Sequence, residues 1–288
     1  ILTLPLALAF LAVIGLLCVS AAQAATPSGT WDNLGIYAGA VQDVAIDPLT
    51  GDAYLVLTGH PGIYRSPDGG DHWEPTGGDF AVAKRILVLT APAGPTGTAT
   101  SCVYANFDAG LMRSDDAGET WTTVADRTRA SNAGAIPGFD VNPNDTDHIV
   151  IGTGGDANFD GGIYVSWDGG NDWTTATMSA VSVSADIVDL AIDPTDGDVV
   201  YAISRSQSNL MAPSQIFRST DGGRSFDAVH KVSPGEQMIG IAVNDQGVVF
   251  AGTDQQLYRS LDGLQWTQIH TATGVAFIEF APDNPNSV

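Results

Sequence analysis

Hydrophobic and polar positions along this chain fall into short runs separated by turns. After residue 24, runs of four to eight residues rich in Val, Ile, Tyr and Thr alternate with clusters of Gly, Pro, Asp and Asn. Residues 41–48 alternate roughly between apolar and polar, whereas residues 53–58 are apolar nearly throughout. The first pattern is typical of a strand with one covered face, and the second of a strand buried on both faces. The chain therefore predicts short β-strands, and no long helical periodicity follows residue 24.

One motif recurs five times between these runs. Its pattern is Ser-x-Asp-x-Gly-x-x-aromatic, and the fifth copy is one residue shorter. Successive motif aspartates lie 48, 52, 53 and 41 residues apart, and such a period indicates a repeat architecture. The motif residues are Ser66, Asp68 and Trp73; Ser114, Asp116 and Trp121; Ser166, Asp168 and Trp173; Ser219, Asp221 and Phe226; and Ser260, Asp262 and Trp266.

The chemistry of this motif predicts a tight turn between two strands. The Asp carboxylate and the Ser hydroxyl can bond to backbone groups of their own turn, and glycine supplies the positive φ that the turn needs. The aromatic residue begins the next strand and can pack on the neighbouring repeat. Five near-copies favour a structural role over a catalytic or metal-binding one.

Each repeat accommodates four short strands, which predicts an all-β fold of four-stranded antiparallel blades, a β-propeller. At least six blades are implied, because residues 275–288 resemble the start of a sixth blade and residues 30–34 resemble an outer strand that would close it. We also expect from this pattern that the chain is incomplete at both ends. The predicted strands cover residues 41–48, 53–58, 62–65 and from 73; 84–90, 101–105, 110–113 and 121–124; 138–142, 148–152, 162–165 and 173–177; 187–193, 199–204, 215–218 and 226–230; and 238–244, 248–253, 256–259 and 266–270.

The first 24 residues differ from the rest. Residues 1–19 are almost wholly apolar, and Ala22-Gln23-Ala24 is a small-x-small cleavage signal, so residues 1–24 are predicted to be a signal peptide and residues 25–288 the propeller. An uncleaved membrane anchor is the alternative, because about 20 apolar residues can span a bilayer. With the leader removed only Cys102 remains, so no intrachain disulfide is expected.

The charge balance limits the partners. The chain has 33 Asp and Glu against 11 Lys and Arg, a net charge of −22. Nucleic acid and anionic membrane surfaces need basic patches, so neither is expected as a partner once the signal is cleaved. The sequence indicates a secreted or periplasmic protein without a cofactor.

The repeated motif resembles the Asp-box, or BNR, repeat of sialidase-like propellers. The longer pattern Tyr-Arg-Ser-x-Asp-Gly-Gly-x-x-Trp is also similar to propellers of the sortilin type, of photosystem II assembly factors and of xyloglucanases. This resemblance covers residues 31–288. It implies the fold strongly and the function weakly, because the repeat serves enzymes, receptors and assembly factors alike.

The resemblance to enzymes of this superfamily implies certain catalytic motifs, and this chain departs from them. Sialidases carry an Arg-Ile-Pro motif, whereas residues 84–87 read Lys-Arg-Ile-Leu. Xyloglucanases carry an Asp in an Arg-Thr-Asp-x-Gly-Gly stretch after the second strand of the first blade, whereas residues 57–62 contain no Asp. No residue is therefore assigned as catalytic, and no metal-ligand spacing identifies a metal site.

The remaining polar residues predict where a ligand would bind. Propeller ligands usually meet the face that carries the loops between the second and third strands, opposite the motif turns. Residues 106–110 and 158–162 are nearly identical loops of the form Asn-Phe-Asp-x-Gly, which are either a second repeated turn or an acidic binding surface. The candidate ligand-binding residues are His60, Asn106, Asp108, Asp156, Asn158, Asp160, Arg205 and Asp254.

We interpret the chain as a non-catalytic binding or assembly module that takes a carbohydrate or protein ligand on this loop face. A glycoside hydrolase of sialidase-like or xyloglucanase-like type is the alternative.

Overall fold

The computed structural model describes residues 40–57, 62–77, 83–91, 100–107, 110–126, 136–154, 161–179, 185–206, 213–271 and 278. The chain divides into two compact units, residues 1–33 and 34–288, and all described residues belong to the second. The predicted signal peptide and the predicted closing strand at 30–34 lie outside the described residues. Within the described part, no helix is long and apolar enough to span a membrane.

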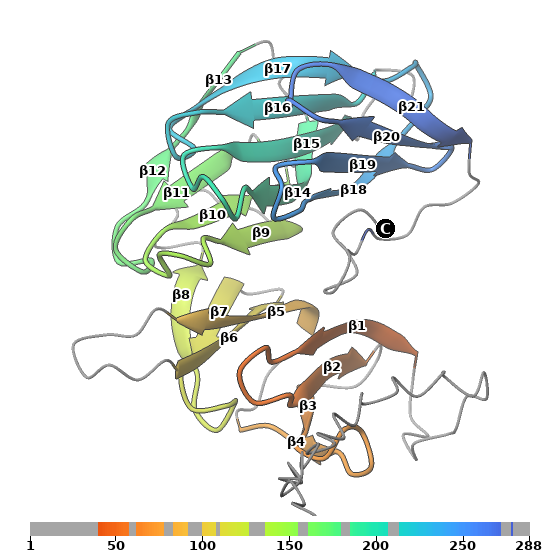
Figure 1. The fold of residues 1–288 in the computed structure, drawn as a ribbon. Coiled ribbons are helices and arrows are strands. Elements are labelled where there is room, and N and C mark those ends of the chain that lie inside the picture. The colour runs from red at the N-terminus through yellow and green to blue at the C-terminus, as the bar shows by residue number, and fades with distance from the viewer. Residues whose placement is uncertain are drawn as a thin grey trace, which may run out of the picture. The chain divides into compact units, whose positions relative to one another are not determined.

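Five sheets follow one another along the chain, each made of strands that are consecutive in sequence (Figure 1). We call them blades 1 to 5. Every pairing within the order first, second, third and fourth strand is antiparallel, as the repeats predict. The blades are β1 (Val41–Ile46), β2 (Ala53–Leu57), β3 (Ile63–Ser66) and β4 (Glu74–Pro75); β5 (Ala83–Ala91), β6 (Thr100–Phe107), β7 (Gly110–Ser114) and β8 (Thr122–Asp126); β9 (Gly138–Val141), β10 (Ile149–Gly152), β11 (Ile163–Ser166) and β12 (Thr174–Thr175); β14 (Ala185–Ile192), β15 (Val200–Ser206), β16 (Gln215–Ser219) and β17 (Ser225–Lys231); and β18 (Met238–Val243), β19 (Val249–Thr253), β20 (Gln256–Ser260) and β21 (Trp266–Thr271).

These blades confirm an all-β propeller architecture. The described residues form five blades rather than six, and the stretch predicted to open a sixth blade lies outside them apart from Ile278.

One predicted strand was wrong in its extent. Residues 173–177 were expected to form one outer strand of blade 3, but the chain leaves that sheet at Ala176. Ala176 N–H still donates to Ile163 O at 2.9 Å, whereas Thr177 N–H donates to Arg224 O of the next blade at 2.9 Å. The resulting strand β13 (Thr177–Met178) pairs in parallel with β17, so the sheet of blade 4 has five strands (Figure 1). The cause is competition for hydrogen bonds, because the outer edge of β17 offers backbone groups to a further strand.

The repeated motif forms the turn between the third and fourth strands of each blade. In the first four copies the buried Ser hydroxyl accepts a hydrogen bond from the backbone N–H of the residue four positions later, at 2.8 to 2.9 Å. The same hydroxyl donates to the motif Asp, which in turn accepts a backbone N–H further along the turn. Positive φ angles at Gly69 and Gly70 confirm the expected role of glycine, and Ala117 adopts φ 58° at the equivalent position of the second copy.

These hydrogen bonds stabilise the ionised carboxylates. The side-chain and backbone groups of Thr120 lower the pKa of Asp116 to about 2, and His72 similarly lowers the pKa of Asp68 to about 2. A carboxyl with a depressed pKa stabilises the fold above its unfolded pKa of about 4 and loses that contribution as the pH falls towards 2. The turns therefore contribute most at neutral pH.

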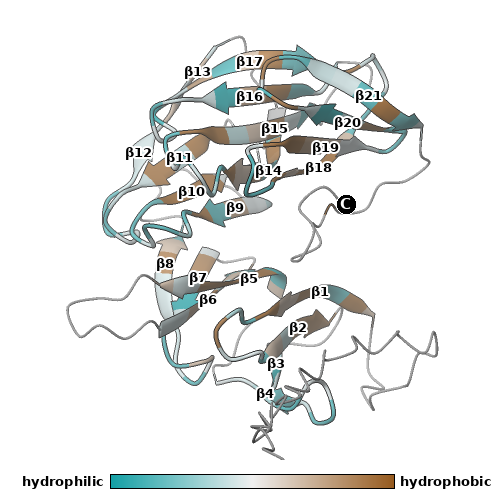
Figure 2. Cartoon of the chain, viewed as in Figure 1, coloured by the Kyte–Doolittle hydropathy of each residue, from teal (hydrophilic) through white to brown (hydrophobic). Residues whose placement is uncertain are grey.

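The core lies between blades rather than within them. Strands such as β2 are coloured as hydrophobic in Figure 2. Each apolar cluster combines the second and third strands of one blade with the first strand of the next. The motif aromatics join these clusters: Trp173 packs with blades 2 and 3, and Phe226 with blades 3 and 4. The expectation that these aromatics pack on a neighbouring repeat is confirmed.

We predict that Ser114→Ala destabilises the protein by about 1–3 kcal/mol, because it leaves the buried Gly118 N–H without its acceptor. Urea unfolding measures this loss. Ser233→Ala, at an exposed position, is the matched control and should change the free energy of unfolding by less than about 0.5 kcal/mol. Equal effects of the two substitutions would contradict a structural role of the motif serine.

Candidate functional site

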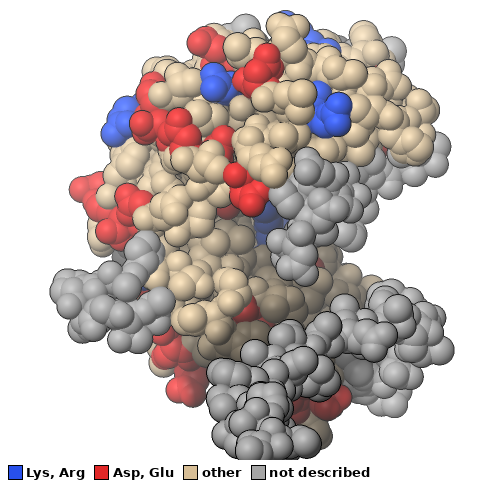
Figure 3. Space-filling model, in the orientation of Figure 1, with Lys and Arg blue, Asp and Glu red and all other residues tan. Residues whose placement is uncertain are grey.

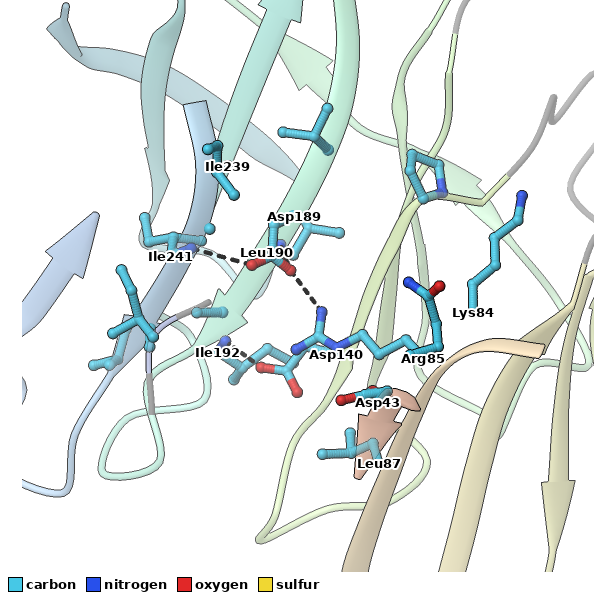
Figure 4. Close-up of a pocket in the computed structure, with 18 residues that line it drawn as sticks. Asp43, Lys84, Arg85, Leu87, Asp140, Asp189, Leu190, Ile192, Ile239 and Ile241 are labelled. Atoms are coloured by element: carbon cyan, nitrogen blue, oxygen red, sulfur yellow. Dashed lines mark hydrogen bonds and ion pairs between the residues drawn. The ribbon is translucent and has the colours of Figure 1, made fainter. Parts of the chain in front are cut away.

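A cavity of about 500 Å³ lies where the first strands of all five blades meet (Figure 4). Strands β1, β5, β9, β14 and β18 each contribute lining residues. Its polar side chains include Asp43, Arg85, Asp140 and Asp189, with Gln42 and Lys84 also on its wall. Because charged side chains from four different blades converge on this cavity, it is the candidate site.

Local irregularities of the strands position three of these side chains. The pairing of the first with the second strand shifts register immediately before Asp43, Arg85 and Asp189. Blade 5 has the same shift before Gly240, which has no side chain to contribute. Such a bulge re-aims the residue that follows it. The three side chains therefore occupy one structural position in blades 1, 2 and 4.

Each Asp of the cavity forms a bracket to the following blade, by which we mean one carboxylate bonded to two backbone N–H groups. Asp189 accepts from its own neighbour Leu190 at 3.0 Å and from Ile241 of blade 5 at 3.1 Å. Asp140 accepts from Val141 at 2.9 Å and from Ile192 of blade 4 at 2.8 Å.

Asp43 makes the same two bonds, to Val44 at 3.0 Å and to Ile86 of blade 2 at 2.8 Å. The carboxylates thus hold the first strands of successive blades together while facing the cavity.

Blade 2 departs from this pattern, because Arg85 replaces the aspartate. Its Nη1 donates to Asp189 Oδ1 at 2.5 Å, across the cavity from blade 2 to blade 4 (Figure 4). Its guanidinium carbon also lies 5.5 Å from the centre of the Phe139 ring, within reach of a cation–π interaction. The Arg85 side chain keeps 32% of its surface exposed and lines the cavity.

Between blades 2 and 3 the amide side chain of Asn106 has the corresponding role. Its side-chain oxygen accepts from Arg85 N–H at 2.7 Å, and its amide donates to Ile136 O at 2.6 Å. The residue is fully buried. Both ends of this side chain are therefore engaged in holding backbone, next to the cavity rather than in it.

The charges in the cavity shift one another's pKa values. Loss of solvation raises the pKa of Asp140 to about 6, against the lowering effect of Arg85 and of the Ile192 N–H. Loss of solvation also raises the pKa of Asp43. Loss of solvation lowers the pKa of Arg85, but the combined charges of Asp189, Asp140 and Asp43 raise it above its usual value. The arginine therefore stays charged, while Asp140 changes its charge within a mildly acidic range.

Most of the charged side chains on the face shown in Figure 3 are acidic. Asp and Glu side chains are spread over the face in Figure 3, with a few Lys and Arg among them, and a basic side chain is visible in the hollow near the centre of the view. The cavity itself holds three carboxylates against Lys84 and Arg85. Among the described residues, no group of three or more His, Cys, Asp or Glu could hold a metal ion.

The ligand-binding residues predicted from sequence have varied positions. Asp254 lies after β19, where its carboxylate accepts from Gln237 N–H at 2.9 Å and holds the start of blade 5. Arg205 lies exposed on β15. The other five candidates, His60, Asp108, Asp156, Asn158 and Asp160, lie outside the described residues, and their role stays a prediction.

The sequence-based reasoning missed Asp43, Asp140 and Asp189 as a group. A signal was present, because Asp43 and Asp189 each interrupt an apolar first strand and precede the Asp-Pro turn by the same interval. Arg85 was considered only as a match to a sialidase motif. Its contact with Asp189, 104 residues away in sequence, follows from the arrangement of the blades.

No protein-family model matches the chain. A xyloglucanase of a Paenibacillus species is 28% identical over 233 residues, which cover 69% of this chain and 22% of the relative. The match thus spans about a fifth of the length of this curated relative.

Solved structures confirm the propeller fold. An ancestral GH74 enzyme superposes with a TM-score of 0.64 at 20% identity, over 86% of this chain and 34% of that one. The extracellular domain of a one-component system of B. thetaiotaomicron gives 0.59 at 15% identity, over 83% and 29%. YCF48 bound to D1 peptide gives 0.56 at 14% identity, over 86% and 74%. At these identities the likeness concerns the fold alone.

We predict that the Asp140 carboxyl titrates near pH 6 and that Arg85→Met raises its pKa further, because the substitution removes a lowering charge. Carbon-13 NMR of the labelled carboxyl measures both values. Arg113→Met removes a guanidinium that pairs with Asp115 elsewhere and should leave the Asp140 pKa unchanged. An Asp140 pKa below about 4, or an Asp140 pKa that Arg85→Met leaves unchanged, would contradict the assigned electrostatics.

Proposed function

We propose that this protein is a non-catalytic binding module of the Asp-box propeller class. Its ligand, a carbohydrate or a protein segment, meets the face that carries the loops after the second strands and the mouth of the cavity. What supports the proposal is the use of the three cavity carboxylates. Each is committed to two backbone N–H groups, which suits a rigid platform and leaves no evident acid–base pair among the described residues.

The proposed location is outside the cytoplasm. The apolar segment at residues 1–24, the net charge of −22 and the fold shared with an extracellular domain all support it. The same charge argues against nucleic acid as a partner. YCF48 bound to D1 peptide is an example of a propeller of this fold with a peptide ligand.

A glycoside hydrolase of xyloglucanase type is the second candidate. The match to a xyloglucanase at 28% identity favours it. The raised pKa of Asp140 is also of the kind that a general acid needs, because an acid must be protonated near the working pH. Against it stands the engagement of both Asp140 oxygens by backbone N–H groups.

The experiment that tests the proposal combines binding with turnover. Xyloglucan oligosaccharides, sialosides and a random peptide array are the probes, with binding measured by calorimetry and turnover by release of reducing ends or sialic acid. We expect binding without turnover. Arg205→Ala should weaken binding at least tenfold, because this exposed arginine lies where the long loop of blade 4 begins.

Arg259→Ala is the matched control, since Arg259 is also exposed but lies on the third strand of blade 5. It should leave affinity within twofold. Release of reducing ends from xyloglucan that Asp140→Asn abolishes would overturn the proposal in favour of the hydrolase. Equal loss of binding in both arginine variants would instead indicate a charge effect and remove the loop face as the site.

A further inference from the structure

Strand β1 presents an unusual set of exposed apolar side chains. Val41, Val44 and Ile46 are 60%, 56% and 58% exposed. They occupy the face of the first strand that points away from blade 2. Three large exposed apolar side chains on one short strand are a recognised sign of a missing contact.

The same positions are buried in the other blades, except that Val243, the equivalent of Ile46 in blade 5, is partly buried. The equivalents of Val44 after the register shift are Ile86, Leu190 and Ile241, which are 4%, 0% and 4% exposed. In blade 3 the corresponding residue is Phe139, at 0%. The equivalents of Val41 are Ala83, Ile136, Ile187 and Met238, which are at most 3% exposed. The buried equivalents of Ile46 are Val88, Val141 and Ile192, which are at most 7% exposed.

What covers these positions elsewhere is always the preceding blade. Ile86 and Val88 pack on Tyr54, Val56 and Ile63 of blade 1. Leu190 and Ile192 pack on Val150, Ile163 and Val165 of blade 3. In all four interfaces the covering surface includes an apolar residue of the third strand three positions before the motif serine, which is Ile63, Leu111, Ile163 or Ile216.

We infer that the exposed face of β1 is a docking surface for a further blade of the same repeat, supplied by the same polypeptide. That blade carries apolar residues on its second strand and an Ile or Leu three positions before the Ser of a Ser-x-Asp turn. The repeat itself argues for this occupant, because the surface continues the series of four interfaces described above. Ile278, which follows β21, lines the same cavity as Gln42 and Asp43 of β1. Ile278 therefore lies at the part of the cavity wall that β1 also lines.

The test measures whether the face is covered in solution. Val44→Cys, in the protein expressed from its complete natural gene, is treated with a maleimide, and labelling is located by peptide mass spectrometry. Leu261→Cys is the exposed control, since Leu261 is 69% exposed in the motif turn of blade 5, and the native buried Cys102 is the protected control. We expect the thiol introduced at position 44 to react at least tenfold more slowly than the thiol introduced at position 261, independently of protein concentration.

Equally fast labelling of the two introduced thiols would overturn the inference, because the face of β1 would then be open to solvent. Protection at position 44 that disappears on dilution, together with a dimer in light scattering, would assign the face to a second copy of the chain and would also overturn it. Val44→Asp provides a second measurement. It should lower the melting temperature as much as Ile241→Asp does, whereas Leu261→Asp should leave it nearly unchanged.

Discussion

Carboxylates on the first strands join three of the four pairs of neighbouring blades, and much of the structure depends on this interaction. The blades of a β-propeller are separate sheets joined by single connecting segments. Packing between blades must therefore determine how neighbouring sheets are oriented. Asp43, Asp140 and Asp189 each bridge two first strands through backbone N–H groups. Hydrogen bonds to a charged acceptor stabilise by about 1.5–3 kcal/mol each, more than neutral ones. The same residues give the cavity its charge, so architecture and candidate site share one set of side chains.

The position of Arg85 follows from that arrangement. Where blade 2 lacks the aspartate, the bulge that would have aimed a carboxylate into the cavity aims a guanidinium instead. Three carboxylates on other blades then keep it charged and hold it by an ion pair with Asp189. Asn106 replaces the missing bracket from the second strand. Because blade 2 has Arg85 at the position of Asp43 and Asp189, the cavity contains both signs of charge.

The repeats predicted the fold well because each turn carries its own hydrogen-bonding residues. Ser66 and Asp68 determine their turn within seven residues of chain, so their role could be predicted locally and is confirmed. The exchange of β13 between sheets could not be predicted, because it depends on the edge that β17 leaves open. The cavity was also beyond local reasoning. Asp189 and Arg85 meet only once blades 2, 3 and 4 are in place, and no short motif encodes that contact.

The account depends most on the claim that each cavity aspartate holds the backbone of the next blade. Amide hydrogen exchange in Asp43→Ala measures this directly. We expect the Ile86 N–H, which loses its acceptor, to exchange at least tenfold faster than in the unmodified protein. The Ile192 and Ile241 N–H groups, held by Asp140 and Asp189, should keep their rates. An unchanged rate at Ile86, or an equal rise at all three amides, would contradict the account.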